Sequence, residues 1–416
     1  MKKLSLPKLL VLNAYWVGLS FMWNALHPII LPAVLLNYVA DAKKNTYLGL
    51  LTFLGLVLAM VIQPLSGALS DGWKSRYGRR RPMIVFGTLF DFVFLAVLAW
   101  GGGLVWLFVG YIGLQLSSNI AHGPLQGLLP DSVPQTQLGV ASSLKTFMDM
   151  LSLIIASLLA GRMLDSVSRD PTNIMLVVIG LLAVSATITI LGVKEEPAQE
   201  HERTDWKALL GQFRINFREN TSYWWLIAER ALFLLGIFGV QAFAQYYLQD
   251  VIHVPDPPKQ TGDLLAALTV ALVILVLIGG WLTDKYGAKR VLYIATFVAA
   301  IGIFFMMFAT DMRGVTIFGA VLGAGIGLFL TPNWALANGL APEAEAGKYL
   351  GLTNLATAGS GALARLEGPA LDWLNAAYPG AWIGYKGMFI FGAVCICLSL
   401  FMLRKIDMNP DGTKSI

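Results

Sequence analysis

The sequence has few charged residues: they make up 13% of its 416 positions, whereas soluble domains carry about 25%. Apolar residues make up 56%, which is more than the core of a soluble protein can hide. The composition therefore excludes a soluble protein and predicts one that crosses a membrane several times. We accordingly do not take the net charge of +5 as a sign of nucleic-acid binding, and we expect the cations to set topology instead.

Cysteine and histidine are also scarce. The two cysteines, Cys395 and Cys397, lie two positions apart in an apolar run, where a helix would turn them about 200° from each other. They cannot easily form a disulfide, and with only four histidines no metal-ligand spacing appears, so we expect no metal and no cofactor. A nucleotide-binding loop and a nucleophile–base pair are missing as well, which argues against an enzyme. The longest polar segment is about 28 residues, too short for the signalling domain of a sensor.

Twelve segments have the apolar character and the length of about 20 residues that cross a hydrocarbon core. They are 9–36, 47–70, 83–101, 104–129, 139–163, 173–193, 222–250, 262–283, 289–310, 314–340, 348–373 and 384–404. Twelve spans place both termini on one side. With the termini inside, the inner segments hold 20 of the 30 Lys and Arg residues and the outer segments hold seven. Because cytoplasmic loops carry an excess of cations, we predict cytoplasmic termini and a location in the cell (plasma) membrane.

The segment 194–221 is the longest predicted loop. Its apolar residues recur at helical spacing with cations between them, and they are Trp206, Leu209, Leu210, Phe213 and Phe217. This pattern predicts a helix lying on the inner membrane surface; the alternative is a linker helix packed on the helix bundle. The sequence thus divides into an N-terminal bundle (1–193), a cytoplasmic linker (194–221) and a C-terminal bundle (222–416).

The two halves of the chain repeat each other. Gly67 and Asp71 recur 213 residues later as Gly280 and Asp284. Three further pairs are 212 residues apart: Pro130 and Pro342, Asp131 and Glu343, and Gly139 and Gly351. Each pair falls on the same span number of its half, which indicates duplication of a six-span unit. We predict an all-α integral membrane protein with twelve transmembrane helices in two pseudo-symmetric six-helix bundles, an arrangement typical of transporters.

One repeated segment carries a family resemblance. The second-half sequence GGWLTDKYGAKR (279–290) resembles the signature loop G-x-x-x-D-[RK]-x-G-x-[RK]-[RK] between spans two and three of the major facilitator superfamily. In the first half, SDGWKSRYGRRRP (70–82), seven positions separate Asp71 from Gly78, where the standard form has three. This longer form is similar to the branch that holds the glycoside–pentoside–hexuronide cation symporters and the sucrose carriers.

The resemblance implies a role for these loops in gating. In the family fold, the acid of each loop meets the N-terminus of a helix in the other half when the cytoplasmic side is closed. A carboxylate beside a helix N-terminus gains about 0.3–1 kcal/mol. We therefore predict a latch on the outward-facing state, and the alternative is that the cations only set topology. The residues assigned to gating are Asp71, Arg76, Gly78, Arg79, Asp131, Asp284, Arg290 and Glu343.

Polar side chains follow spans one, four, seven and ten, the four spans that line the central cavity in this superfamily. Amides donate and accept hydrogen bonds, and an indole offers an apolar platform, so the set suits a hydroxyl-rich solute. The alternative is that the amides hold helices together. The candidate substrate-binding residues are Asn24, His27, Gln115, Asn119, His122, Gln241, Gln245, Trp334 and Asn338.

Charged residues inside spans are candidates for coupling, because such groups are costly in a membrane. Lys145 and Asp149 are four residues apart and can pair on one helix face. Glu229 and Arg230 are adjacent and point about 100° apart, so they are not an obvious local pair. We predict that these two pairs couple transport to protons; the alternative is that they are fixed structural ion pairs.

The resemblance also bears on the coupling ion. Sodium-coupled members of the branch carry paired aspartates in span two, whereas this chain has no acid between Tyr47 and Ser70. Sodium coupling is therefore not expected, and protons are. We predict a secondary transporter that carries a sugar or glycoside by proton symport; the alternative solute is an amphipathic or lipid-like organic compound. We expect it to work as a monomer among membrane lipids, without a nucleic-acid partner.

Overall fold

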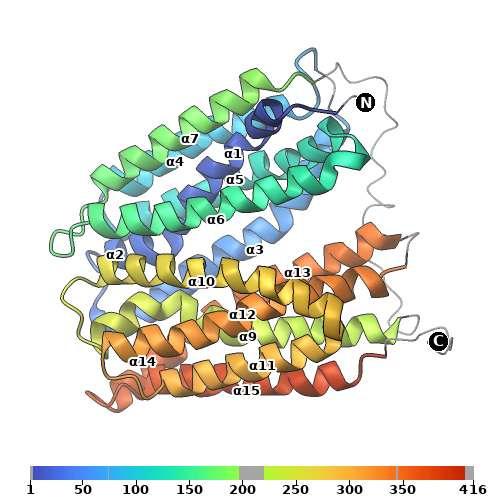
Figure 1. Ribbon diagram of the computed structural model, residues 1–416. Coiled ribbons are helices and arrows are strands. Elements are labelled where there is room, and N and C mark those ends of the chain that lie inside the picture. The colour runs from blue at the N-terminus through green and yellow to red at the C-terminus, as the bar shows by residue number, and fades with distance from the viewer. Residues whose placement is uncertain (1–2, 74, 196–219, 343–344, 408–416) are drawn as a thin grey trace. The chain divides into compact units, whose positions relative to one another are not determined.

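The computed structural model describes most of the chain, and every regular element in the described part is a helix (Figure 1). The described ranges are 3–73, 75–195, 220–342 and 345–407. The helix predicted within 194–221 lies almost wholly outside these ranges. That helix, and the domain boundaries drawn around it, therefore stay predictions.

The helices group into two compact units. Unit 1 comprises Met1–Trp206 with Asp256–Ala266, and unit 2 comprises Lys207–Pro255 with Ala267–Ile416. The first turns of helix α10 (Pro257–Tyr286) therefore belong to unit 1, although the rest of that helix belongs to unit 2.

Unit 1 contains the six spans predicted for the first half of the chain. Their helices are α1 (Leu6–Ala25) continued by the π-helix η1 (Leu26–Ile30) and α2 (Leu31–Leu35), then α3 (Lys44–Asp71), α4 (Arg81–Trp100), α5 (Leu104–Ser132), α6 (Leu138–Met163) and α7 (Thr172–Gly192). Two short 3₁₀ turns, η2 (Asp41–Lys43) and η3 (Gln135–Gln137), precede α3 and α6. Within the unit, α5 packs against both α3 and α4, while α1 packs against α6 and α7.

Unit 2 contains the spans predicted for the second half. Its helices are α9 (Thr221–Asp250), the larger part of α10, α11 (Ala288–Met306), α12 (Met312–Leu340), α13 (Ala346–Arg365), α14 (Glu367–Ala377) and α15 (Ile383–Arg404). Here α11 packs against α12, and α9 packs against α13 and α15. The predicted span 348–373 is divided between α13 and α14, which meet at Leu366.

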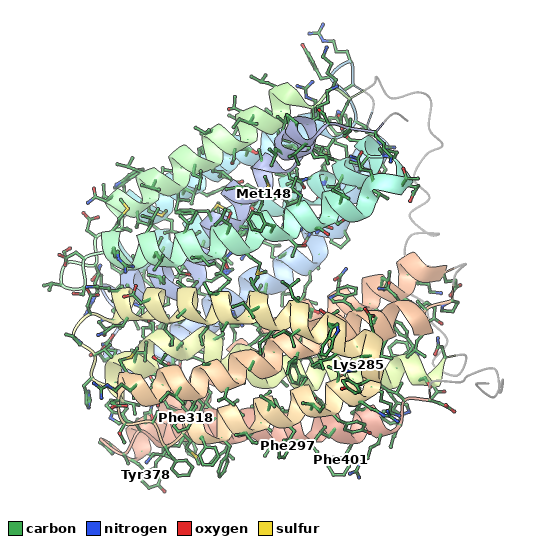
Figure 2. All side chains as sticks on the ribbon, in the orientation of Figure 1. Met148, Lys285, Phe297, Phe318, Tyr378 and Phe401 are labelled. Carbon is green, nitrogen blue, oxygen red and sulfur yellow. The ribbon has the colours of Figure 1, made fainter. Side chains whose placement is uncertain are left out.

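Eleven helices or helix series in the described ranges are long and apolar enough to cross a membrane. The α13–α14 pair occupies the place of the remaining predicted span. Large apolar side chains cover the outer faces of the helices, and Figure 2 shows Phe297 and Phe401 projecting from α11 and α15. These two side chains are 62% and 55% exposed. Apolar exposure on this scale is tolerated where lipid replaces water.

Two prolines shape the helices that carry the predicted polar stripes. Pro28 has no backbone N–H to donate, and the chain around it forms the π-helix η1 instead of a continuous α-helix. Helix α5, in contrast, continues through Pro124. The neighbouring Gly123 allows α5 to approach α3 closely, since a Cβ there would lie 2.2 Å from Ser66 Oγ. The helix therefore changes type locally around Pro28, whereas at Gly123 and Pro124 the α-helix continues and packs closely against α3.

Candidate functional site

A ladder of hydrogen bonds links η1 to α5 in unit 1. His27 Nε2 lies 2.9 Å from Tyr111 Oη, and Gln115 Nε2 donates to the same oxygen at 2.8 Å. Asn119 Nδ2 then donates to the Gln115 backbone oxygen at 2.7 Å and to its Oε1 at 3.2 Å. Three of the predicted substrate-binding residues are thus brought together through Tyr111, a fully buried residue that the sequence analysis did not select.

Aromatic rings accompany this ladder. The Trp23 ring stacks on His27 with centroids 4.9 Å apart and packs edge-on against Tyr111 at 6.4 Å. Asn24, predicted to share the face of His27, instead donates to the Ser20 backbone oxygen at 2.8 Å. Its amide is therefore engaged with its own helix.

The predicted pair Lys145–Asp149 is present on α6, with Nζ 3.1 Å from Oδ2. Ser20 Oγ on α1 donates to the other carboxylate oxygen at 2.6 Å. The Lys145 ammonium also lies 3.8 Å from the centre of the Trp16 ring, which satisfies a second side of the cation. Trp16 in turn contacts His122 edge-on at 5.0 Å. The carboxylate, the ammonium, the indole and the imidazole therefore form one continuous cluster across α1, α5 and α6.

Unit 2 holds a second polar cluster, centred on α9 and α12. Asn333 Nδ2 donates to Glu229 Oε2 at 2.8 Å, and its Oδ1 accepts from Arg230 Nη1. Arg230 Nε donates to Thr357 Oγ1 at 2.9 Å, and its guanidinium lies 4.9 Å from the centre of the Trp334 ring. Glu229 and Arg230 are thus joined through an amide on another helix, although their side chains leave α9 in different directions.

Glu229 has one oxygen that is not satisfied. The residue is fully buried, and its Oε1 has no hydrogen-bond partner among the described residues. A buried polar atom without a partner costs free energy, so it is the place where an added proton disturbs the fewest existing contacts. This geometry suits a carboxyl group that changes its protonation state.

The other predicted binding residues of unit 2 have different surroundings. Gln241 is exposed and Gln245 is buried, so the two predicted binding residues on α9 do not share one environment. Asn338 is exposed, and its Nδ2 donates to the Trp334 backbone oxygen at 3.0 Å. Of the predicted set in this unit, Trp334 contacts the Glu229–Asn333–Arg230 cluster directly through Arg230.

Arg80 is the centre of the charged loop between α3 and α4. Its buried guanidinium lies 2.7 Å from Asp71 Oδ1 and 2.8 Å from Asp131 Oδ2, and it donates to Ser70 Oγ at 2.9 Å. Gly127 of α5 leaves room for this group, since a Cβ there would lie 2.2 Å from Arg80 Cζ. Arg80 therefore joins the ends of α3 and α5 to the start of α4. The predicted gating residues Asp71 and Asp131 both belong to this network, but the cation between them was not among the predicted gating residues.

The neighbouring arginines behave differently from one another. Arg79 Nη2 lies 2.7 Å from Asp131 Oδ2 and so belongs to the same network. Arg76 is exposed, and its Nη2 donates to Tyr77 Oη at 2.5 Å. Its guanidinium also lies over the Tyr77 ring, 4.7 Å from the centroid. Among the predicted cations of this loop, only Arg79 shares an acid with Arg80.

Gly78, which was predicted to take part in gating, lies at a position where the backbone and a close neighbour both favour glycine. Its φ angle is 98°, in the left-handed region that favours glycine, and a Cβ would lie 1.9 Å from Glu195 Oε2. That oxygen accepts from the backbone N–H groups of Arg80 and Arg81 at 3.1 and 3.2 Å. Burial raises the pKa of Glu195, and the two N–H donors act in the opposite direction. Glu195, which follows the C-terminal end of α7, therefore holds the loop in place through these two hydrogen bonds.

The corresponding loop of unit 2 has a different set of contacts. Asp284 and Arg290 are exposed, and Gly287 has a φ angle of 84°. Lys289 Nζ donates to the Ile406 backbone oxygen at 2.6 Å, beyond the end of α15. Glu343 lies outside the described residues. The predicted contacts of Asp71 and Asp284 with helices of the opposite half stay predictions.

Asp91 and Glu367 are acids on helices to which the sequence analysis assigned no role. Asp91 on α4 accepts from Ser117 Oγ at 2.5 Å, and its Oδ2 has no hydrogen-bond partner in the described part of the chain. Glu367, at the start of α14, lies against α9 at Gly239, where a Cβ would be 2.5 Å from its carboxylate. In the described ranges, no group of three or more His, Cys, Asp or Glu side chains could hold a metal ion.

Comparison with known proteins identifies the family of this chain. The model of the Major Facilitator Superfamily matches residues 14–364. The chain is 26% identical over 316 residues to the uncharacterized symporter YnaJ of Bacillus subtilis, covering 70% of this chain and 65% of the symporter. It is 21% identical over 331 residues to the glucuronide carrier protein homolog of Escherichia coli, covering 76% of this chain and 71% of that protein. The match to sucrose transport protein SUC4 of Arabidopsis thaliana is 26% identical and covers 31% of this chain and 28% of the plant protein.

Solved structures agree with this assignment at the level of the fold. The nucleoside transporter NupG matches with a TM-score of 0.73 at 14% identity, covering 96% of this chain and 100% of that one. Two points follow from the match of the family model to most of the sequence and from the helical fold. The chain is a transporter rather than an enzyme, and it belongs to the Major Facilitator Superfamily.

Proposed function

We propose that the protein is a secondary active transporter that moves a sugar or glycoside by alternating access, coupled to protons. Its relatives support the solute class, since they include a glucuronide carrier homolog and a sucrose transport protein. A symporter among them supports ion coupling. The charged-loop spacing described above is similar to that of the same branch.

The observation that carries the solute class is the His27–Tyr111–Gln115–Asn119 ladder with Trp23 stacked beside it. Amide, imidazole and phenol groups can each exchange one internal hydrogen bond for one to a solute hydroxyl. An aromatic ring next to them supports the apolar face of a pyranose. Such a surface recognises many weakly polar hydroxyls rather than one strong charge.

Proton coupling is proposed to run through Asp149. A proton on this carboxylate removes the charge that holds Lys145 Nζ at 3.1 Å, and the ammonium then becomes available to other acceptors. Ser20 Oγ, which donates to Asp149 at 2.6 Å, can rotate to accept from the protonated group. Ser20 and Trp16 are on α1, and η1, which carries His27, continues that helix. A change in the protonation of Asp149 therefore alters the contacts of the same helix series that carries His27.

The Glu229–Asn333–Arg230 cluster is proposed as a second coupling element. The unsatisfied Glu229 Oε1 supports this role, because a proton added there leaves the hydrogen bond between Asn333 and Glu229 Oε2 in place. Gating is proposed to involve Asp71, Arg79 and Asp131 with Arg80, because any movement of α3 relative to α5 must strain this network. The excess of Lys and Arg in alternate loops supports a plasma-membrane location with cytoplasmic termini.

An amphipathic solute is the second candidate class. The chain is 22% identical over 376 residues to the multi-drug resistance efflux pump PmrA of Streptococcus pneumoniae, covering 87% of this chain and 86% of the pump. The aromatic content of 11% would also suit such a solute.

Counterflow in proteoliposomes separates the two classes. The full chain is reconstituted, loaded with one unlabelled compound and tested for uptake of the labelled form, using hexoses, pentoses, disaccharides, glycosides and hexuronides. Exchange of at least one sugar, weakened in Gln115→Ala but not in the α3 control Gln63→Ala, is the expected result. Exchange of amphipathic dyes with no sugar exchange would contradict the proposed class.

A further inference from the structure

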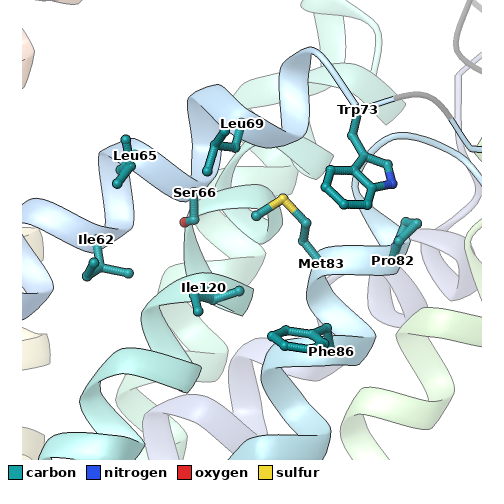
Figure 3. A pocket seen from close by; sticks show the side chains of 9 residues that line it. All are labelled: Ile62, Leu65, Ser66, Leu69, Trp73, Pro82, Met83, Phe86 and Ile120. Atoms are coloured by element: carbon teal, nitrogen blue, oxygen red, sulfur yellow. The ribbon is translucent and has the colours of Figure 1, made fainter.

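A groove opens on the side of unit 1 between α3, α4 and α5, close to the charged loop (Figure 3). Its volume is about 400 Å³, within the range of about 300–1,000 Å³ that is usual for small-molecule sites. Several of its rim side chains are exposed, among them Trp73 at 47% and Phe86 at 54%. It is separate from the hydrogen-bond ladder on α5, and none of the predicted binding residues lines it.

The lining of the groove is apolar. Eight of its nine residues are hydrocarbon, aromatic, thioether or proline side chains, and Figure 3 shows Met83, Phe86 and Ile120 directed toward its interior. The ninth is Ser66, whose Oγ is already bonded to the Asn119 and Gln63 backbone oxygens at 2.8 and 3.0 Å. The groove therefore offers few polar groups to a sugar, and it suits a hydrocarbon chain.

The position of the groove matches one leaflet of a membrane. Its residues on α3 begin at Ile62, and the nine helical steps from there to the end of α3 at Asp71 span roughly 14 Å, which is about half of a 30 Å hydrocarbon core. Trp73 lies at the loop end, where an indole prefers the headgroup region. The groove thus extends from the membrane surface on the loop side to about the middle of the bilayer.

The loop at the mouth of the groove is cationic. Four arginines in the described part of the loop lie between positions 76 and 81, and the acids that contact them there are Asp71, Asp131 and Glu195. The balance of these described charges is therefore positive by one. Arg76 is exposed three residues beyond Trp73, where its guanidinium can reach a phosphate. Lipid phosphates at this surface would meet net positive charge beside an apolar groove.

We propose that this groove binds one acyl chain of an anionic phospholipid, with the phosphate held by the loop around Arg76. The occupied groove braces α3 against α4 beside Arg80, so the lipid stabilises the same loop that the Asp71–Arg80–Asp131 network holds. The site does not depend on which solute the protein transports.

The test uses Trp73 as an internal reporter. The full chain is placed in nanodiscs whose phosphatidylcholine is replaced stepwise by lipid brominated on the acyl chain, with either a phosphatidylglycerol or a phosphatidylcholine headgroup. The Trp73 signal is the difference between the protein and Trp73→Phe. We expect half-quenching of this signal at a severalfold lower fraction of brominated phosphatidylglycerol than of brominated phosphatidylcholine.

Two variants make the test specific. Arg76→Gln should abolish the preference for the anionic lipid, and Ile120→Phe should reduce quenching by filling the groove. Leu89→Phe, on the exposed face of α4 outside the groove, should leave quenching unchanged. Equal quenching by the two headgroups would overturn the proposal, because the groove would then hold bulk lipid. Absence of quenching by both would also overturn it, because protein from another helix or another copy would then cover the groove.

Discussion

Replacement of Arg80 by glutamine should loosen the charged loop more than any other single arginine change in it. The guanidinium has only 7% of its side-chain surface exposed, and it makes three contacts between 2.7 and 2.9 Å. Removing one partner of a buried ion pair typically costs about 3–5 kcal/mol, because the other charge is left buried. The Asp71 and Asp131 side chains are 51% and 29% exposed, so water can hydrate them after the change. We therefore expect a smaller cost of about 2–3 kcal/mol.

Thermal unfolding followed by intrinsic fluorescence measures this cost. A change of 1 kcal/mol shifts the midpoint by about 2–4 °C in a unit of this size, so the expected decrease is roughly 4–12 °C. The unfolding midpoint of Arg80→Lys should lie between those of the native protein and Arg80→Gln, because an ammonium keeps the charge but cannot make the same directed contacts. Arg76→Gln is the matched control, since Arg76 is exposed and lies over the ring of its neighbour Tyr77. Equal shifts for Arg80→Gln and Arg76→Gln would refute the assignment of Arg80 as the centre of the network.

Three further predictions concern coupling, strain and pH. Asp149→Asn should abolish uptake driven by a pH gradient while counterflow persists, whereas Asp41→Asn, which removes the exposed acid of the Asp41–Lys44 pair, should preserve both activities. Gly78→Ala should destabilise the protein by about 1–3 kcal/mol more than Gly103→Ala in thermal unfolding. Both have positive φ, but only Gly78 faces a neighbour at 1.9 Å. Burial raises the pKa of Glu195 above its ordinary 4.5, so stability from this group is present below 4.5 and lost as pH rises through the raised value. The stability of Glu195→Gln relative to the native chain should therefore increase across that interval, and a constant difference would contradict this.

Local sequence spacing predicted the contacts that lie on one helix. Lys145 and Asp149 form the predicted pair because four residues bring side chains to the same helix face. The bridge between Glu229 and Arg230 could not be found in this way. Its central residue, Asn333, is about 100 positions away, and the link depends on how α9 packs against α12. Apolar length likewise predicted the spans but not the division of 348–373 at Leu366.

In the charged loop, too, the sequence did not identify the residue at the centre of the network, although the residues involved are close in the chain. The sequence analysis assigned Asp71 and Asp131 to gating, and both acids are in contact with arginines. Among three consecutive arginines, however, only packing decides which one is buried. Gly127 on α5 makes the space that Arg80 fills, and this glycine has no motif around it that would have marked the position.

Proton movement driven by solute tests the central claim most directly. Proteoliposomes that hold a pH-sensitive dye and no imposed gradient are mixed with a sugar that exchanges in counterflow. The account predicts that entry of the sugar acidifies the lumen in the native protein, and that Asp149→Asn transports the sugar without this change. Sugar entry with no change of pH in the native protein, or an unchanged proton signal in Asp149→Asn, would contradict it.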